Sequence, residues 1–319
     1  MWLSSLPVAS NFDYKMVSKV KLVRRGIKKI IIVVLTILLV GVCFLRLYHS
    51  RTDIHSPLQI DIRSRVGWVG CHEPEMKLKI DLVISPHFDY NASDEALHQR
   101  EKEYMTALQR NLNHNFVRRI HVLTTNTKEV TQRLEKYKLS NQSKLLIIKL
   151  KRIELTRDVF EYISQNLVGT DVMFINGDIY LGNGFHCVDP AVMRENKIMY
   201  ALTRRIRKEE TCEIKDFCTE MDYIGSHDAF LFHLTEPFPH STLEHLEFLH
   251  PSLGMDNMII WMFETKLKYC VLNPCTILEV FHLHCSALRN YHPIKRVVDY
   301  DTGKSPFTNK LVCKSSQRV

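Results

Sequence analysis

The residues best suited to chemistry include an acidic side chain that follows an apolar run in the middle of the sequence. Residues 172–175 are apolar, and Asn176-Gly177-Asp178-Ile179-Tyr180 comes directly after them. If the run is a buried strand, Asp178 leaves the sheet at the edge where a diphosphate would bind. Its carboxylate would suit a hard cation such as Mg²⁺ or Mn²⁺. The alternative interpretation is that Asp178 only stabilises a turn.

A pair of histidines near the end of the sequence is the second candidate group. His282 and His284 follow the strand-like run 276–280, and residues two apart in a strand point to the same side. Paired imidazoles on one face are suitable metal ligands. The alternatives are two half-buried polar residues at a strand edge, or a structural zinc site with Cys270 and Cys275. In an oxidising compartment a disulfide is the favoured state of those cysteines.

A third candidate is Asp256, in the segment Gly254-Met255-Asp256-Asn257 before the apolar run 258–263. The pattern predicts a loop that enters a helix, with Asp256 at the helix start. There it would act either as an N-cap or as a general base that accepts a proton from a hydroxyl. Upstream, residues 226–228 place polar groups just before another predicted strand.

The elements that must position these side chains alternate between strand and helix. Strands are predicted at residues 78–84, 120–123, 145–148 and 172–175. The helices between them are predicted at 93–113, from the capping-box segment 126–129, and from Thr156 as the cap. The first has Met105, Leu108 and Leu112 on one face, and the third has Val159, Phe160, Ile163 and Leu167. This alternation predicts an α/β fold with a parallel sheet covered on both faces, whose ligands bind at the carboxyl ends of the strands.

The N-terminal part of the chain has the pattern of a membrane anchor. Residues 30–45 hold no charge, and residues 1–29 hold seven Lys or Arg against one Asp. This asymmetry predicts a cytosolic N-terminus and a translocated remainder. A cleaved signal peptide is the alternative, but the basic segment is long and no small-x-small site follows. We therefore expect a cytosolic basic arm, a signal-anchor, a stem, a lumenal domain and a basic tail at residues 1–29, 30–47, 48–76, 77–292 and 293–319.

Charge and cysteine content agree with that topology. Residues 1–29 contribute +6 of the formal net charge of +8, so the remainder has no basic surface for nucleic acid. Eight of the nine cysteines lie after the apolar run, which predicts several disulfides. Asn91 and Asn141 begin Asn-x-Ser triplets on the same side and are predicted glycosylation sites.

Taken in order, five motifs between residues 80 and 292 resemble a family of Golgi-type (type II membrane) glycosyltransferases. These belong to the nucleotide-diphospho-sugar transferase superfamily and have the A-type fold. The motifs are Leu155-Thr156-Arg157-Asp158-Val159-Phe160, Asn176-Gly177-Asp178-Ile179-Tyr180, the Ser-x-Asp-x-Phe segment 226–230, Gly254-Met255-Asp256-Asn257, and His282-Leu283-His284 with Arg289-Asn290-Tyr291. The resemblance implies a single Rossmann-like, mixed but mainly parallel sheet flanked by helices, with residues 77–292 as the catalytic domain.

The resemblance also implies a nucleotide-sugar donor, a hydroxyl acceptor on a glycan, protein or lipid, and a divalent cation, Mn²⁺ or Mg²⁺. We assign Asp256 as the catalytic residue and Asp178, His282 and His284 as metal ligands. The donor contacts are assigned to Thr156, Asn176, Asp178 and Asp228. The sequence departs from the usual metal motif of two acids spaced one apart, because Asn176 stands in the first position.

Two other classes of function remain open from the residues alone. One is a membrane-anchored metallohydrolase that uses Asp178, Asp256, His282 and His284 around one or two metals. The other is a catalytically silent binding domain on the same fold. A sulfotransferase is disfavoured, since no Gly- or Ser-rich phosphate loop follows the first predicted strand.

Overall fold

The computed structural model describes residues 78–85, 95–153, 155–207, 218, 227–286 and 297. The chain divides into two compact units, Met1–Val66 and Gly67–Val319, and every described residue lies in the second. The predicted basic arm, membrane anchor and stem lie outside the described residues, as does the predicted tail apart from residue 297. Within the described part, no helix combines the length and the apolar character needed to cross a membrane.

A mixed, mainly parallel sheet forms the centre of the domain and confirms the predicted fold class. Its seven strands have the order β3-β2-β1-β4-β7-β6-β8. Strand β7 runs antiparallel to both of its neighbours, and every other adjacent pair is parallel. The strands are β1 (Ile80–Ile84), β2 (Val117–Thr124), β3 (Leu145–Lys149), β4 (Asp171–Ile175), β6 (Ile198–Thr203), β7 (His227–His233) and β8 (Cys270–Leu272).

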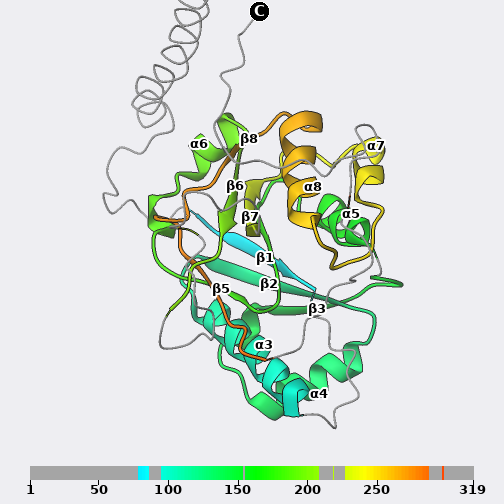
Figure 1. The fold of residues 1–319 in the computed structure, drawn as a ribbon, viewed down its shortest axis with the longest axis vertical. Coiled ribbons are helices and arrows are strands. Elements are labelled where there is room, and N and C mark those ends of the chain that lie inside the picture. Colours follow the sequence, from blue (N-terminus) through cyan, green and yellow to red (C-terminus); the bar gives the residue numbers. More distant parts are fainter. Residues whose placement is uncertain are drawn as a thin grey trace, which may run out of the picture. The chain divides into compact units, whose positions relative to one another are not determined.

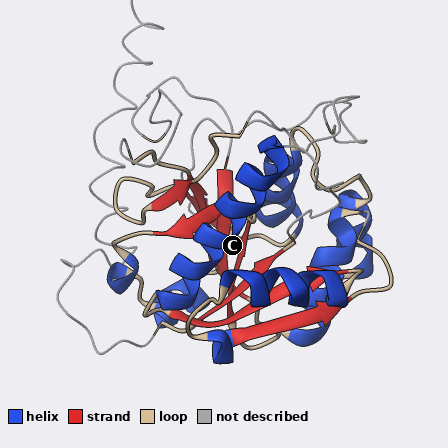
Figure 2. Cartoon of the chain, turned by 90° about the horizontal axis from the view of Figure 1, so that it is seen from below, coloured by secondary structure: helices blue, strands red, loops and turns tan. Residues whose placement is uncertain are grey.

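Helices cover both faces of this sheet. Figure 1 shows α3 and α4 on one side of the strands and α5 and α8 on the other, and Figure 2 shows helices packed in front of the strands. The helices are α3 (Glu95–Asn113), α4 (Thr127–Tyr137), α5 (Thr156–Asn166), α6 (Pro190–Glu195), α7 (His240–Leu243) and α8 (Met255–Trp261). A π-helical turn, Met262–Lys266, extends α8, and short 3-10 turns form at Gln142–Lys144, Phe185–Cys187 and Glu244–Leu246.

The apolar patterns of the sequence account for this packing. The predicted faces of α3 and α5 are buried. Between α5, α8 and the sheet, Phe160, Phe232 and Phe263 belong to one apolar cluster, with the Phe232 and Phe263 ring centroids 4.7 Å apart. Helix α4 begins as predicted, since the Asn126 side chain accepts a hydrogen bond from the Glu129 N–H at 3.3 Å.

Four local predictions need correction. Thr156 is the first residue of α5 rather than its cap, because Leu155 holds the N-cap position and its N–H donates to Asp158 at 2.9 Å. The N-cap of α8 is Gly254, so Asp256 lies in the first turn and does not cap the helix. Strand β7 already begins at His227, so Asp228 lies in the strand and not before it. Residues 276–279 form no strand, because the last strand spans Val280–His282.

A two-stranded antiparallel ribbon, β5 (Ile179–Leu181) with β9 (Val280–His282), joins the two candidate segments. Ile179 pairs with His282, which brings Asp178 close to the histidines. Helix α3 anchors the ribbon through Asn111. The Asn111 Nδ2 donates to the Ile179 carbonyl at 2.9 Å, and its Oδ1 accepts from the Leu181 N–H at 3.0 Å. One side chain thus completes the hydrogen bonding of the β5 edge.

Disulfides form on the side of the chain where they were predicted. Cys218 and Cys275 are bonded, with a Cα–Cα distance of 5.8 Å. Cys187, Cys270 and Cys285 are also disulfide-bonded. A zinc site that combines Cys270 and Cys275 with the histidines is therefore wrong, because a bonded sulfur is not a thiolate ligand.

Candidate functional site

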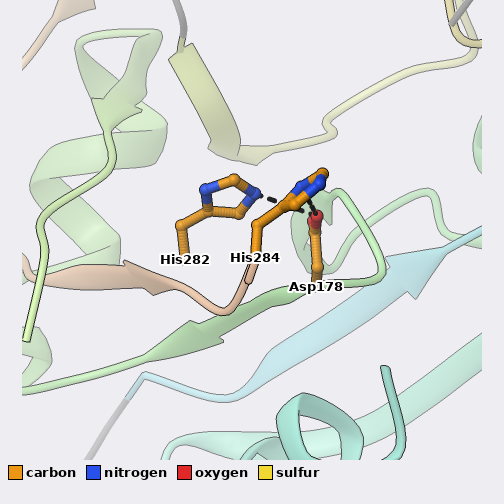
Figure 3. Close-up of side chains that lie close together, drawn as sticks. All are labelled: Asp178, His282 and His284. Atoms are coloured by element: carbon orange, nitrogen blue, oxygen red, sulfur yellow. Dashed lines mark hydrogen bonds and ion pairs between the residues drawn. The ribbon is translucent and has the colours of Figure 1, made fainter. Parts of the chain in front are cut away.

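Asp178, His282 and His284 converge on one point, and we call these three residues the metal cluster (Figure 3). The Asp178 Oδ2 lies 2.9 Å from the His282 Nε2 and 3.6 Å from the His284 Nδ1. One ligand atom from each residue lies within 4.8 Å of the others, and all three side chains are buried. The sequence had predicted this juxtaposition of residues separated by more than a hundred positions.

The backbone on either side of the cluster fixes its geometry. Asp178 occupies the turn between β4 and β5, where the Ile179 N–H donates to the Asn176 carbonyl at 3.1 Å. The Leu283 N–H donates to the Asp178 carbonyl at 2.9 Å, which holds the residue between the two histidines against the turn. Only His282 lies in β9, whereas His284 lies beyond its end. Strand alternation alone therefore does not explain why both imidazoles face Asp178.

A fourth side chain, Arg100 of α3, completes the cluster and was missed from the sequence. Its guanidinium forms a hydrogen-bonded ion pair with the Asp178 Oδ2. It also donates to the Leu283 carbonyl at 3.3 Å, and its Cζ lies 4.4 Å from the centroid of the Tyr104 ring. Arg100 is 4% exposed, so this charge is committed to the interior.

Glu103, one turn further along α3, holds the chain that follows His284. Its Oε1 accepts the Cys285 and Ser286 N–H groups at 2.6 and 2.8 Å, and its Oε2 pairs with Arg100 at 2.9 Å. Arg100 and Glu103 together position both imidazoles through the backbone of residues 283–286. Sequence reasoning missed this pair because an Arg and a Glu three apart on a helix give an ordinary surface pattern.

The charges around the cluster keep Asp178 ionised. Burial alone would raise its pKa, but the charges of His282 and Arg100 outweigh burial and hold the pKa of Asp178 well below its usual range. Asp178 and Glu103 are two acids against one Arg100, so the group carries one net negative charge with neutral imidazoles. A divalent cation would reverse that sign, and a diphosphate would then be attracted to the site.

The donor set fits a divalent cation of intermediate hardness. One carboxylate and two imidazoles suit Mn²⁺ better than Mg²⁺, because Mg²⁺ strongly prefers oxygen ligands. The contact between Arg100 and the Asp178 Oδ2 competes with such an ion, since both cations favour the same oxygen. The cluster therefore provides three ligands and one competing internal cation.

A second polar group lies at the same edge of the sheet, at the ends of β4, β6 and β7. The Asn176 Nδ2 donates to the Asp228 Oδ1 at 3.2 Å, and the Arg204 Nη1 donates to the Asp228 Oδ2 at 3.0 Å. Two of the predicted donor-binding residues are thus in direct contact. Arg204 adds a cation that the sequence analysis did not select.

Asp256 joins this group through the backbone of β7. Its Oδ2 accepts the His227 N–H at 3.1 Å, and its side chain is half-buried. Burial lowers the pKa of His227, although the charges of Asp256 and Asp228 oppose this shift. The His227 Nδ1 is buried and has no hydrogen-bond partner among the described residues. A carboxylate and a neutral imidazole therefore lie side by side at the candidate catalytic position.

The remaining predicted residues lie elsewhere or make other contacts. Thr156 is buried, and its Oγ1 lies 3.3 Å from the His250 Nδ1, so its donor contact remains a prediction. Asn141 is exposed, and its Nδ2 donates to the Asn113 Oδ1 at 2.8 Å. Asn91 lies outside the described residues, and both glycosylation sites remain predictions.

Comparisons with known proteins give fold-level similarities only. No protein-family model and no curated protein matches this sequence. S. aureus TarS in complex with UDP-GlcNAc is 16% identical with a TM-score of 0.29, over 45% of this chain and 39% of that chain. The glycosyltransferase GlyE of Streptococcus pneumoniae TIGR4 is 14% identical with a TM-score of 0.35, over 61% of this chain and 45% of that chain.

A third similarity is to HddC from Yersinia pseudotuberculosis, 13% identical with a TM-score of 0.27, over 52% of this chain and 78% of that chain. The chain thus spans less than half the length of TarS and GlyE. Since TM-scores below 0.5 do not establish a common fold, nothing about the site is inferred from these three proteins.

Proposed function

We propose that this protein is a glycosyltransferase that moves a sugar from a nucleotide-sugar donor to a hydroxyl acceptor on a glycan, protein or lipid. The observation that carries the proposal is the buried Asp178 carboxylate at the carboxyl end of a central parallel strand, surrounded by His282, His284 and Arg100. In open α/β sheets this edge is where ligands bind. Such a cationic surrounding suits a diphosphate.

Asp178, His282 and His284 would hold the cation, and a bound divalent cation would neutralise the diphosphate of the donor. Arg100 supplies a fixed positive charge next to the same oxygen, so the site retains cationic character when it holds no metal. Arg204 and Asn176 are assigned to donor binding through their shared partner Asp228. Mn²⁺ is favoured over Mg²⁺ by the two imidazoles.

Asp256 is proposed as the general base. The His227 N–H fixes its Oδ2, so Oδ1 is assigned to accept the proton of the acceptor hydroxyl. Because Gly254 holds the N-cap position, a structural capping role no longer competes with this assignment. A base of this kind contributes about 10²–10⁴-fold to the rate.

We propose a type II topology with the domain in the lumen of the Golgi or the endoplasmic reticulum. The basic arm before the apolar run 30–45 supports this orientation, and the Cys218–Cys275 disulfide supports an oxidising compartment. The anchor would keep the active site close to membrane-bound acceptors.

A metallohydrolase is the second candidate, favoured by the use of two imidazoles and one carboxylate as metal ligands. The two functions differ in their need for a donor. A transferase releases nucleoside diphosphate only from a nucleotide sugar, whereas a hydrolase cleaves simple esters or glycosides without one.

The test is an assay of purified full-length protein with Mn²⁺, a panel of nucleotide sugars and a mixture of glycan acceptors. Release of nucleoside diphosphate from one donor, accelerated by acceptor, is the expected result. Parallel reactions with p-nitrophenyl phosphate and p-nitrophenyl glycosides should show no cleavage. Cleavage of these compounds in the absence of donor would instead establish the hydrolase.

A further inference from the structure

An open cleft of about 550 Å³ lies at the end of β5 that is farther from Asp178. It is formed by residues 110–116, at the end of α3 and the turn into β2, by residues 180–186, and by Arg207. Four residues separate Asp178 from Gly182, which corresponds to about 13 Å along a strand. The turn into β2 is at the amino ends of the parallel strands, so the cleft is distinct from the metal cluster.

The lining of this cleft is basic and rich in amides. Among the described residues that line it there are no Asp or Glu side chains. The polar side chains are those of two arginines, two histidines and three asparagines, namely Arg110, Arg207, His114, His186, Asn113, Asn115 and Asn183. At the rim, Glu279 contacts the Asn183 Nδ2 at 3.2 Å but is neutralised by Arg205 at 2.7 Å. The cleft therefore presents a net positive charge.

A stacked aromatic pair holds the two arginines in place. The Tyr180 and Phe281 rings pack with centroids 5.3 Å apart across the β5–β9 ribbon. The Arg110 Cζ lies 4.3 Å from the Tyr180 centroid, and the Arg207 Cζ lies 4.6 Å from the Phe281 centroid. A guanidinium that packs on an aromatic face donates its hydrogen bonds from its edges. Both cations are thus positioned before any ligand arrives.

The floor of the cleft depends on two glycines. A Cβ on Gly182 would lie 2.4 Å from the Phe281 ring, and a Cβ on Gly184 would lie 1.8 Å from the Ile277 carbonyl oxygen. Gly184 also has a φ of +94°, which disfavours other residues. The loop therefore packs directly against β9 and the preceding turn, leaving a backbone-lined surface between the arginines and the amides.

We propose that this cleft binds the anionic group of a saccharide, a carboxylate, sulfate or phosphate on a sugar ring. Two prepositioned guanidiniums match such an anion, and the asparagine amides match the neighbouring hydroxyls. The site goes beyond the proposed transferase activity, because its residues contact neither Asp178 nor Asp256 and its ligand requires no nucleotide and no metal. It would select acidic glycans over neutral ones.

The experiment is a calorimetric titration of the full-length protein in EDTA, without nucleotide sugar. The probes are a sulfated heparin-derived disaccharide, the same disaccharide without sulfate, and inorganic phosphate. We expect the sulfated disaccharide to bind at least tenfold more tightly than either of the other two. Equal affinity for phosphate would overturn the saccharide part of the proposal, and binding of neither anion would overturn the site.

Asn113→Asp is the sharpest variant because it introduces a negative charge at the cleft without removing a contact. The Asn113 Oδ1 accepts hydrogen bonds from Gln109, Ser140 and Asn141, and an aspartate oxygen accepts all three. We expect at least a tenfold loss of affinity, matched by Arg110→Gln. Unchanged affinity in Asn113→Asp, at an unchanged melting temperature, would contradict the proposal.

Two controls separate this site from others. Arg194→Gln removes an exposed arginine on α6, outside the cleft, and should leave affinity for the disaccharide unchanged. Asp178→Asn should also leave it unchanged, so that failure of the cleft proposal and failure of the transferase proposal give different results. A loss in Arg194→Gln equal to that in Arg110→Gln would show non-specific charge attraction and overturn the site.

Discussion

The Arg100 guanidinium and the Asp178 carboxylate form a buried ion pair between residues that are 78 positions apart. The pair joins the first helix of the described domain to the turn that follows the central strand β4. It also sets the electrostatics of the metal cluster, because a fixed cation already occupies one side of the carboxylate that would bind a metal.

Removing Arg100 should destabilise the protein and make it respond to metal. Arg100→Met leaves Asp178 buried without its main fixed partner, which should lower the free energy of unfolding by about 3–5 kcal/mol. Because Arg100 and a cation favour the same oxygen, Mn²⁺ should recover part of this loss in the variant and have less effect on the parent protein. Urea unfolding with and without Mn²⁺ measures both.

The control for Arg100 is Arg119→Met, which removes an exposed arginine of β2. It should change stability by less than about 0.5 kcal/mol. If Arg100→Met were as stable as the control, the ion pair would contribute nothing and the electrostatic description of the cluster would be wrong.

Asp256→Asn should separate structure from catalysis. The amide oxygen of Asn can accept the same His227 N–H, so the unfolding midpoint should change little. If Asp256 is the general base, turnover should fall about 10²–10⁴-fold while nucleotide-sugar affinity is retained. Steady-state kinetics with a matched binding titration distinguishes the two. Near-normal turnover would leave Asp256 a structural residue.

The sequence predicted those parts of the fold that depend on local periodicity. The apolar runs 145–148 and 172–175 fall within strands β3 and β4, and the predicted apolar face of α5 is buried. The metal cluster was predicted as well, because an acid after a buried strand and two histidines two apart are recognisable without the structure. Their contact then follows from the pairing of Ile179 with His282.

The contacts made by long-range packing were not predictable in this way. Arg100, Glu103 and Arg204 reach the site across helix–ribbon and strand–strand contacts, and nothing adjacent to them in the sequence marks the partner. The N-cap predictions at Thr156 and Asp256 were wrong by one and two positions, since Leu155 and Gly254 adopt the cap geometry through their backbones. Helix boundaries of this kind depend on tertiary contacts rather than on side-chain type.

Two buried histidines should make the protein less stable as the pH falls below about 6.5. Burial lowers the pKa of both His114 and His227 from the ordinary value of 6.5. Between that value and the lowered ones, the unfolded chain binds protons that the folded protein does not, so stability rises with pH in this window and is lost on acidification. Urea midpoints at pH 7.5 and pH 5.5 measure the difference.

His114→Gln is the matched variant for this pH dependence. A glutamine amide can still donate to the Gly182 carbonyl, which the His114 Nε2 contacts at 3.0 Å, but it does not titrate. The loss of stability between the two pH values should therefore be smaller in the variant. An identical loss would assign the pH dependence to other groups.

Asn141 should carry a glycan when the protein is expressed in secretory cells. The residue is exposed, and a glycosylated Nδ2 keeps one N–H for its bond to Asn113. Ser143→Ala removes the acceptor triplet and leaves the Asn141 side chain in place, so it should abolish the glycosidase-sensitive mass shift at this site. A variant with Ser93→Ala tests the second predicted site, Asn91, separately. A protein without glycan at either position would contradict the proposed lumenal topology.

The most direct test of the proposed function is the binding of nucleotide sugars to the full-length protein in the presence of Mn²⁺. Titration with a panel of nucleotide sugars should find one that binds, and Asp178→Asn should weaken that binding at least tenfold without changing the melting temperature in EDTA by more than a few degrees. His284→Gln, which removes a second predicted ligand, should weaken the Mn²⁺-dependent part in the same way. If no nucleotide sugar binds, or if Asp178→Asn binds one as tightly as the parent protein, the assignment of this site to a glycosyltransferase is contradicted.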